Sequence, residues 1–305
     1  MAVASVRLVL TALLIVATPA DAQQLGTKIM GGLGIDAGTQ GPPGLFVLDR
    51  FIQFGASTLR DNTGDRLPVA GLDVLVRANA LGLACTLATH RGPRLTFAAG
   101  VPYARVALNS EEPQASVDRL GVGDIYVLPI KVGWRNVRHD VVASYAFFAP
   151  TGKFEPKTGI GVGRGQWTHQ FSIGGGLFAD SLRSKRASAL LSYELNGRKR
   201  GIDITRGDLL QLHGGAGISI SKLAVVGVAA YALWQVRDDR GADLPPALAG
   251  SRTRTYGLGP EIDVTIPKLG LRVESRIEWD IATRARPQGY VFAFAASYRA
   301  LAPPK

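Results

Sequence analysis

The chain has 305 residues, with 37 glycines, 2 methionines and 46% hydrophobic residues. A helical bundle favours alanine, leucine, glutamate, lysine and methionine, so this composition argues against one and fits many strands joined by turns. The formal net charge of +11 suits an anionic lipid or an anionic solute. Nucleic acid is not an expected partner, because the sequence has no basic run with interleaved aromatic residues.

The first 22 residues have the pattern of a secretory signal peptide. Arg7 precedes an apolar run of about ten residues, which is too short to span a bilayer. Ala20 and Ala22 have the small-residue spacing that signal peptidase requires. We therefore expect cleavage after residue 22 and export from the cytoplasm. Residues 23–44 would then form a periplasmic lead-in to the first strand.

From residue 45 onwards, apolar and polar side chains alternate with period two, which is typical of strands that have two different faces. In the segment 271–284, for example, one face carries leucine, valine, isoleucine and tryptophan, and the other carries the charged residues. On a helix these charges would be scattered around the axis. The alternation predicts twelve strands, at approximately 45–60, 72–88, 94–105, 120–135, 139–150, 165–179, 186–197, 207–220, 222–236, 253–266, 270–283 and 289–300.

The connections between these strands alternate between long and short. The long ones include 106–120, 150–165 and 236–251, whereas others, such as 136–138, have only a few residues. A transmembrane barrel has short periplasmic turns and long extracellular loops, and a soluble barrel has no reason to keep this bias. We therefore predict an all-β, transmembrane antiparallel barrel of about twelve strands in the bacterial outer membrane. It would comprise residues 45–305, including a short C-terminal tail.

Aromatic residues recur at a spacing that matches the membrane thickness. Tyr126 and Trp134 lie eight residues apart on one face, and so do Tyr290 and Tyr298. Eight residues of strand span ~26 Å, or ~20 Å along the membrane normal at a tilt of ~40°, close to the apolar band of an outer-membrane barrel. The pattern predicts a lipid-facing aromatic girdle of Tyr126, Trp134, Trp167, Trp279, Tyr290 and Tyr298.

The faces opposite these aromatic residues carry charges that a barrel would direct into its lumen. Charges of both signs can brace one another across strands, or they can form a constriction that selects solutes by charge. Pro129 has no N–H to donate, and a closed barrel has no free edge, so we predict a bulge or local widening there. The predicted lumen-lining residues are Lys131, Glu194, His213, Glu261, Asp263, Arg272, Glu274, Arg276, Glu278, Asp280 and Arg299.

The sequence contains no catalytic, metal or cofactor motif that we accept. His-Glu-x-x-His and Cys-x-x-Cys are missing, and Cys85 is the only cysteine. The glycine-rich run 32–37 resembles a dinucleotide fingerprint, but "GTQGPPG" follows it where a helix would be needed. His169 and Ser172 are three residues apart, so a strand points them to opposite faces.

Five blocks resemble a known family of bacterial outer-membrane proteins. They are "GVGDIYVLPIKVGW" (121–134), "FFAPTGKF" (147–154), "GVGRGQWT" (161–168), "DDRGADLP" (238–245) and "SRTRTYGLGPEI" (251–262). In order and spacing they are similar to the meta-pathway phenol-degradation family, also described as SphA-like transporters. The resemblance implies an outer-membrane protein encoded near the catabolism of aromatic or other carbon compounds. It implies no agreed catalytic residues and no settled substrate.

These patterns favour a passive outer-membrane channel for small organic compounds, such as aromatic or carboxylated catabolic substrates. Two alternatives stay open. One is a barrel-embedded hydrolase of lipid or lipopolysaccharide, and the other is a closed structural or adhesive barrel. In every case the expected partners are outer-membrane lipid, lipopolysaccharide and, during biogenesis, the barrel-assembly machinery. A channel adds a small organic solute.

Overall fold

The computed structural model describes residues 30–89, 92–111, 114–156 and 161–302. The predicted signal peptide, residues 1–22, lies outside these ranges, as do residues 23–29. The strands are β1 (Gly44–Arg60), β2 (Arg66–Leu67), β3 (Asp73–Leu87), β4 (Arg94–Ser110), β5 (Ala115–Val122), β6 (Ile125–Arg135), β7 (His139–Ala149), β8 (Thr168–Phe178), β9 (Lys185–Asn196), β10 (Leu209–Ser219), β11 (Ala224–Gln235), β12 (Arg254–Ile266), β13 (Leu271–Arg284) and β14 (Arg286–Leu301).

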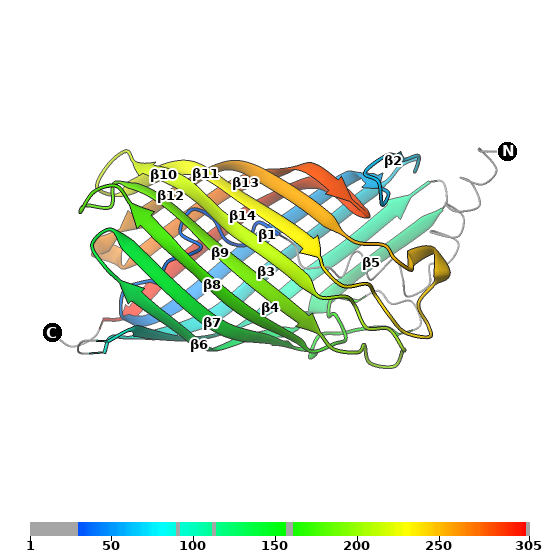
Figure 1. Cartoon of the computed structure of the whole chain (residues 1–305), viewed down its shortest axis with the longest axis horizontal. Helices are drawn as coiled ribbons and strands as arrows, with labels where there is room; N and C mark the ends of the chain where they lie inside the picture. Colours follow the sequence, from blue (N-terminus) through cyan, green and yellow to red (C-terminus); the bar gives the residue numbers. More distant parts are fainter. Residues whose placement is uncertain (1–29, 90–91, 112–113, 157–160, 303–305) are drawn as a thin grey trace.

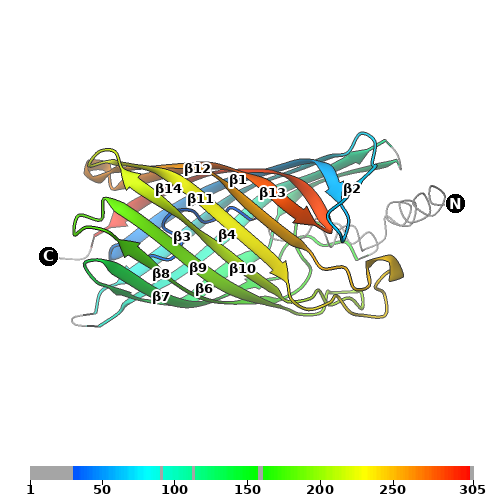
Figure 2. The same ribbon diagram turned by 45° about the horizontal axis from the view of Figure 1, so that its top comes forward.

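Twelve of these strands form one closed antiparallel barrel within the described residues (Figures 1 and 2). Each strand pairs with the next along the chain, apart from the short β2 and β5, and β14 pairs with β1 to close the sheet. The prediction of a twelve-stranded transmembrane-type barrel is therefore confirmed. Closure leaves the twelve barrel strands paired on both sides, which is the condition for strands to lie in lipid. None of the helices in the described ranges has the length and apolar character needed to cross a membrane.

Two connections differ from the sequence prediction. Residues 106–120 do not form a long loop, because β4 continues to Ser110 and β5 pairs back onto it as a hairpin that projects past the barrel. The turn from β13 to β14 consists of Ala285 alone, at the end where the long loops lie, and its φ of 52° is unusual for a residue other than glycine. The other connections at that end are long, and those at the opposite end are short.

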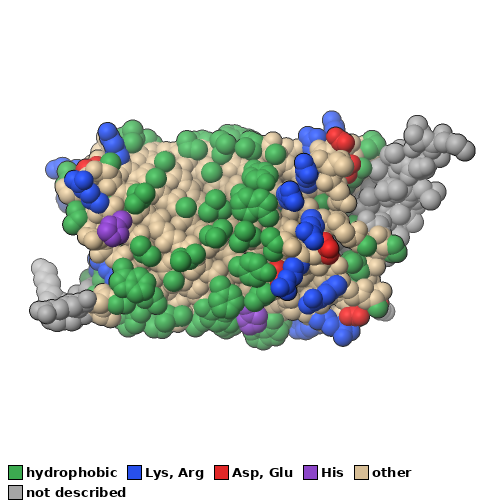
Figure 3. Space-filling view, viewed as in Figure 1, with side chains coloured by type: hydrophobic (Ala, Val, Ile, Leu, Met, Phe, Trp, Pro, Cys, Tyr) green, Lys and Arg blue, Asp and Glu red, His purple; other side chains and the backbone are tan. Residues whose placement is uncertain are grey.

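The outer wall is apolar over its middle and charged near both ends (Figure 3). Large apolar side chains point outwards from this wall; Leu81 and Leu177, for example, are 63% and 70% exposed. The inner positions of the same strands carry polar and charged residues that are almost fully buried, such as Gln211 and Glu278. A soluble protein would not place its polar residues inside and its apolar residues outside, so the pattern matches a barrel with lipid around it.

A bulge in β6 interrupts the alternation at Pro129, as the missing N–H predicts. The pairing of β6 with β7 shifts between Val127 and Ile130, and its pairing with β4 shifts between Thr96 and Ala98. The bulge inserts one extra residue, so the side chains before it point to the opposite face from those after it. This reversal changes the environment of Tyr126, as described below.

Candidate functional site

The interior of the barrel is occupied by the chain's own N-terminal segment, residues 30–43 (Figure 1). This range is part of the predicted periplasmic lead-in, and the structure places it inside the sheet. Two turns make it compact: the Ala37 N–H donates to the Gly34 carbonyl over 2.9 Å, and the Thr39 N–H donates to the Asp36 carbonyl over 3.0 Å. Inside the lumen, the barrel wall therefore binds a short segment of its own chain.

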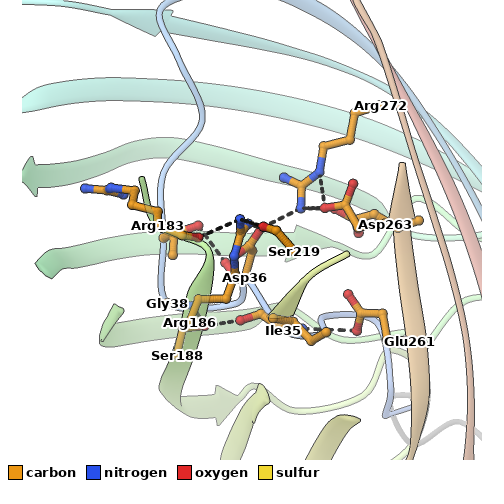
Figure 4. Close-up of polar contacts among 12 residues, drawn as sticks. Ile35, Asp36, Gly38, Arg183, Arg186, Ser188, Ser219, Glu261, Asp263 and Arg272 are labelled. Atoms are coloured by element: carbon orange, nitrogen blue, oxygen red, sulfur yellow. Dashed lines mark hydrogen bonds and ion pairs between the residues drawn. The ribbon is translucent and has the colours of Figure 1, made fainter. Parts of the chain in front are cut away.

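The wall meets the backbone of this segment with side chains from β9 and β12 (Figure 4). The Ile35 N–H donates to Glu261 Oε2 over 3.0 Å, and the Gly38 N–H donates to Ser188 Oγ over 3.1 Å. The Ser188 hydroxyl in turn donates to the Ile35 carbonyl over 2.6 Å. A buried backbone needs such partners, because an unpaired N–H or carbonyl carries the full desolvation penalty.

Asp36 is the charged anchor of the segment. Its Oδ2 atom accepts from Arg272 Nη2 over 2.7 Å and lies 3.4 Å from Arg186 Nη1 (Figure 4). Arg272 is shared, because its Nε donates to Asp263 over 2.7 Å and its Nη2 lies 2.9 Å from Glu274 Oε1. One guanidinium thus connects the segment to the carboxylates of β12 and β13.

A second arginine, Arg276, lies among the charged side chains that β12 and β13 direct into the lumen. We call this group the charged ladder: Glu261, Asp263, Arg272, Glu274, Arg276, Glu278 and Asp280. Arg276 is 3% exposed, and its Nε donates to the Gly31 carbonyl over 2.8 Å. Three carboxylates surround it, each 3.7 Å away: Glu261, Glu274 and Glu278. A buried charge needs this compensation, so the wall charges brace one another and hold the segment at the same time.

The periplasmic end of the segment is bound by cations and an amide. Lys131 Nζ donates to the Thr39 carbonyl over 2.6 Å, and Arg94 Nη1 donates to the Gly41 carbonyl over 3.2 Å. The Gln40 amide reaches the β4 wall at Thr96 Oγ1 over 2.7 Å. Arg299 also donates to the Pro43 carbonyl. Hydrogen-bond donors of the wall therefore surround the segment at this end of the barrel.

The other end of the segment packs in an apolar environment. Met30 is 1% exposed and forms a buried cluster with Leu209, Tyr231 and Leu233. The Tyr231 hydroxyl donates to Asp280 Oδ1 over 2.7 Å, so the cluster borders the charged ladder. Apolar contact at one end and ion pairs in the middle together fix the position of the segment.

Glycines in the wall make room for the segment. A Cβ atom at Gly215 would lie 3.2 Å from Cα of Ile35, and one at Gly227 would lie 2.8 Å from its Cδ1. The segment needs glycine as well, since a Cβ at Gly38 would overlap the carbonyl oxygens of Gly175 and Ala189. Close backbone approach of this kind is a recognised use of glycine.

The structure places the eleven predicted lumen residues on the inner side of the wall. Six of them contact the N-terminal segment or bridge to it: Lys131, Glu261, Asp263, Arg272, Arg276 and Arg299. Glu194 and His213 are buried on β9 and β10, and Arg164 lies 3.8 Å from Glu194. The other three predicted residues belong to the charged ladder described above: Glu274, Glu278 and Asp280.

Five of the six predicted girdle residues lie on the outer side. Trp134, Trp167, Trp279 and Tyr298 are about half exposed, at 49% to 52%. Tyr290 is partly covered, because its hydroxyl accepts from Gln53 Nε2 over 2.9 Å.

Tyr126 is the exception, and its predicted position in the lipid-facing girdle is wrong. Its ring packs 5.1 Å from Phe148, over which the Arg164 guanidinium lies at 4.5 Å, and Arg164 is the neighbour of Glu194 inside the barrel. The cause is the bulge at Pro129, which reverses the alternation of β6, so that Tyr126 faces inwards while Trp134 faces outwards.

Sequence reasoning missed the partners that only the fold brings together. The sequence predicts residues 23–44 only as a periplasmic lead-in, rejects 32–37 as a dinucleotide motif, and assigns no role to Asp36, Gln40, Arg186 or Ser188. One signal was available: a run rich in glycine and proline, with a single acid and no strand alternation, directly precedes the first strand. Such a run suits close packing against other backbone.

The histidines do not form a common site. His169 lies on the outer wall, where its Nδ1 is 2.8 Å from the Tyr145 hydroxyl, whereas His213 is 2% exposed and lies on the inner side. His139 is exposed at the periplasmic end of β7, and His90 lies outside the described residues. In the described ranges, no group of three or more His, Cys, Asp or Glu side chains is arranged to hold a metal ion.

Comparison with known proteins places this chain in a family. Residues 56–296 match the family described as "Putative MetA-pathway of phenol degradation", so the chain belongs to that family. No curated protein matches it in sequence. Among solved structures it is similar to the COG4313 outer membrane channel from Pseudomonas putida F1, at 11% identity and a TM-score of 0.73, covering 89% of this chain and 99% of that chain.

It is also similar to the beta domain of the Bordetella autotransporter BrkA, at 12% identity and a TM-score of 0.52, covering 84% of this chain and 99% of that one. At these identities the likenesses establish the fold, an outer-membrane type of β-barrel.

Proposed function

We propose that the protein is an outer-membrane channel for small organic solutes whose pathway is closed by its own N-terminal segment. The channel reading is supported by the family match and by the likeness to a channel from Pseudomonas putida. The observation that carries the proposal is the way the segment is bound. Residues 30–43 lie in the lumen and are held by hydrogen bonds and ion pairs that water can replace.

The wall behind the segment is polar, which is what a solute pathway requires. Arg272, Arg276 and Glu261 would remain lining the lumen after the segment moves, and their charges would be free to meet a solute. We propose that these groups, with the other inner-wall charges, select solutes by charge and shape. Aromatic and carboxylated catabolic compounds are the class that fits both the family description and the guanidinium groups.

The test is conductance and solute flux of the purified protein in planar bilayers and liposomes. The mature chain should conduct in brief or small openings, and a variant lacking residues 23–43 should give larger and longer ones. Liposome flux with benzoate, phenol and a neutral sugar of similar size would then rank solutes. If the variant refolds as a barrel yet passes neither ions nor solutes, the channel proposal is wrong.

A reversible lock provides the matched control. A Cβ at Gly176 would lie 3.0 Å from Thr39 Cγ2, so cysteines at these two positions are close enough for a disulfide. In a Cys85→Ser background, oxidised Thr39→Cys/Gly176→Cys should conduct less than the same protein after reduction. Each single cysteine variant should be insensitive to the reductant.

The two alternative functions have less support. A hydrolase needs a histidine and a hydroxyl nucleophile in one site, but His169 and His213 lie on opposite sides of the wall. A closed structural barrel needs no displaceable segment, and it predicts that the variant lacking residues 23–43 does not conduct. We propose a non-enzymatic role in the outer membrane, with lipopolysaccharide and the barrel-assembly machinery as partners.

A further inference from the structure

Two arginines face each other on the outer wall at the extracellular end of the barrel. Arg254 on β12 and Arg284 on β13 are directly paired across the sheet, and both side chains are exposed. The next pair, Thr255 and Thr283, points inwards and is joined by a 3.1 Å contact between hydroxyls. The two guanidinium groups therefore share one outer face. Like charges at directly opposed positions destabilise a sheet.

Four other exposed arginines at this end of the barrel have a carboxylate partner. Arg105 pairs with Asp118 at 2.5 Å and Arg252 pairs with Asp238 at 2.7 Å. Arg198 pairs with Asp203 at 3.1 Å and Arg237 with Asp208 at 3.2 Å. Among the described residues neither Arg254 nor Arg284 has such an ion pair.

The loop next to the pair contains two carboxylates, Asp61 and Asp65, but neither forms an ion pair with Arg254 or Arg284. Arg284 lies against the loop after β1, with its Nε 3.8 Å from where a Cβ of Gly64 would be. Asp61 in that loop accepts from the backbone N–H groups of Thr63, Gly64 and Asp65, so it is engaged within its own turn.

The pair lies at the depth of the lipid headgroups. Trp234 is the cross-strand partner of Arg254 on its other side. The indole N–H of Trp234 donates to the Tyr256 hydroxyl over 2.9 Å, and the two rings meet edge to face at 5.8 Å. Paired tryptophan and tyrosine on an outer wall mark the boundary of the apolar band. Figure 3 shows basic side chains gathered beyond the apolar belt.

We propose that Arg254 and Arg284 together bind a phosphate group of lipopolysaccharide in the outer leaflet. An anion between the two guanidinium groups removes their repulsion, and each planar guanidinium can hold phosphate through two hydrogen bonds. Lipopolysaccharide is the occupant because the long loops mark this end as extracellular, where its phosphates lie beside the aromatic boundary. This inference does not depend on the channel proposal.

The experiment measures binding of phosphorylated lipid A to the purified full chain in detergent, with dephosphorylated lipid A and phosphatidylglycerol in parallel. Arg254→Gln/Arg284→Gln should weaken binding of phosphorylated lipid A about tenfold or more, because charge-assisted contacts are lost. Binding of dephosphorylated lipid A should not change. The matched control, Arg105→Gln/Arg252→Gln, removes two exposed arginines that already have partners, and it should bind as the native chain does.

A stability readout separates this role from a merely structural one. Without lipopolysaccharide, Arg284→Gln should raise the thermal midpoint, since it relieves the repulsion. With saturating lipopolysaccharide, the same variant should have the lower midpoint. Unchanged lipid A affinity in the double variant, or an equal loss in the control, overturns the proposal. An equal loss of phosphatidylglycerol binding overturns the assignment to lipopolysaccharide.

Discussion

Neutralising Asp36 should release the N-terminal segment and open the channel. The substitution Asp36→Asn removes the negative charge that contacts Arg272 at 2.7 Å and Arg186 at 3.4 Å. Hydrogen bonds to charged groups contribute about 1.5–3 kcal/mol. Arg272 keeps Asp263 and Glu274 and its side chain is 33% exposed, so we discount this to about 1–2 kcal/mol. The open population should therefore rise about 5- to 30-fold.

Single-channel recording measures this change directly, as the ratio of open to closed time at fixed voltage. The matched control is Glu274→Gln, which removes a carboxylate from the same arginine but leaves the segment's own contact intact. It should leave the open probability within about twofold of the native value. If Asp36→Asn behaves like the native protein, or if Glu274→Gln opens the channel as much, Asp36 does not anchor the segment.

Three further outcomes are expected. Gly38→Ala should increase conductance, because the added Cβ would overlap wall carbonyls, whereas Gly41→Ala should not, since nothing lies within 4 Å of its Cβ position; equal conductance in the two variants would contradict the close packing. Burial lowers the pKa of Lys199 to about 7, so the extracellular loops should become more resistant to proteolysis as the pH rises from 7 towards 10.5, and Lys199→Met should remove this dependence. The sign follows because the unfolded lysine binds the proton over that range and the folded one does not. A lipid-phase quencher should quench a bimane label at Trp134→Cys but not at Tyr126→Cys in a Cys85→Ser chain; quenching at both sites would refute the reversal of β6.

Much of the barrel could be predicted because its information is local. Period-two alternation identifies each strand and its two faces without knowledge of its neighbours. The twelve predicted strands accordingly match β1, β3, β4 and β6 to β14, with ends that differ by a few residues. The sequence does not predict β5, because its segment, 115–122, carries two adjacent charges, Asp118 and Arg119, and follows the polar stretch 109–114. Its pairing with β4 beyond the wall supplies the hydrogen bonds that the local pattern does not indicate.

The sequence alone also determined which charges face inwards, since their parity along β12 and β13 is fixed by the strand. Only the tertiary structure decided what those charges meet. Asp36 and Arg272 are separated by 236 positions, and no periodicity links a coil to a strand at that distance. The sequence predicts the bulge at Pro129, because proline has no N–H. The effect on Tyr126 depends on which part of β6, before or after the bulge, keeps the inward and outward faces that the alternation predicts. That choice is made by the whole closed sheet, since every strand is held by two partners.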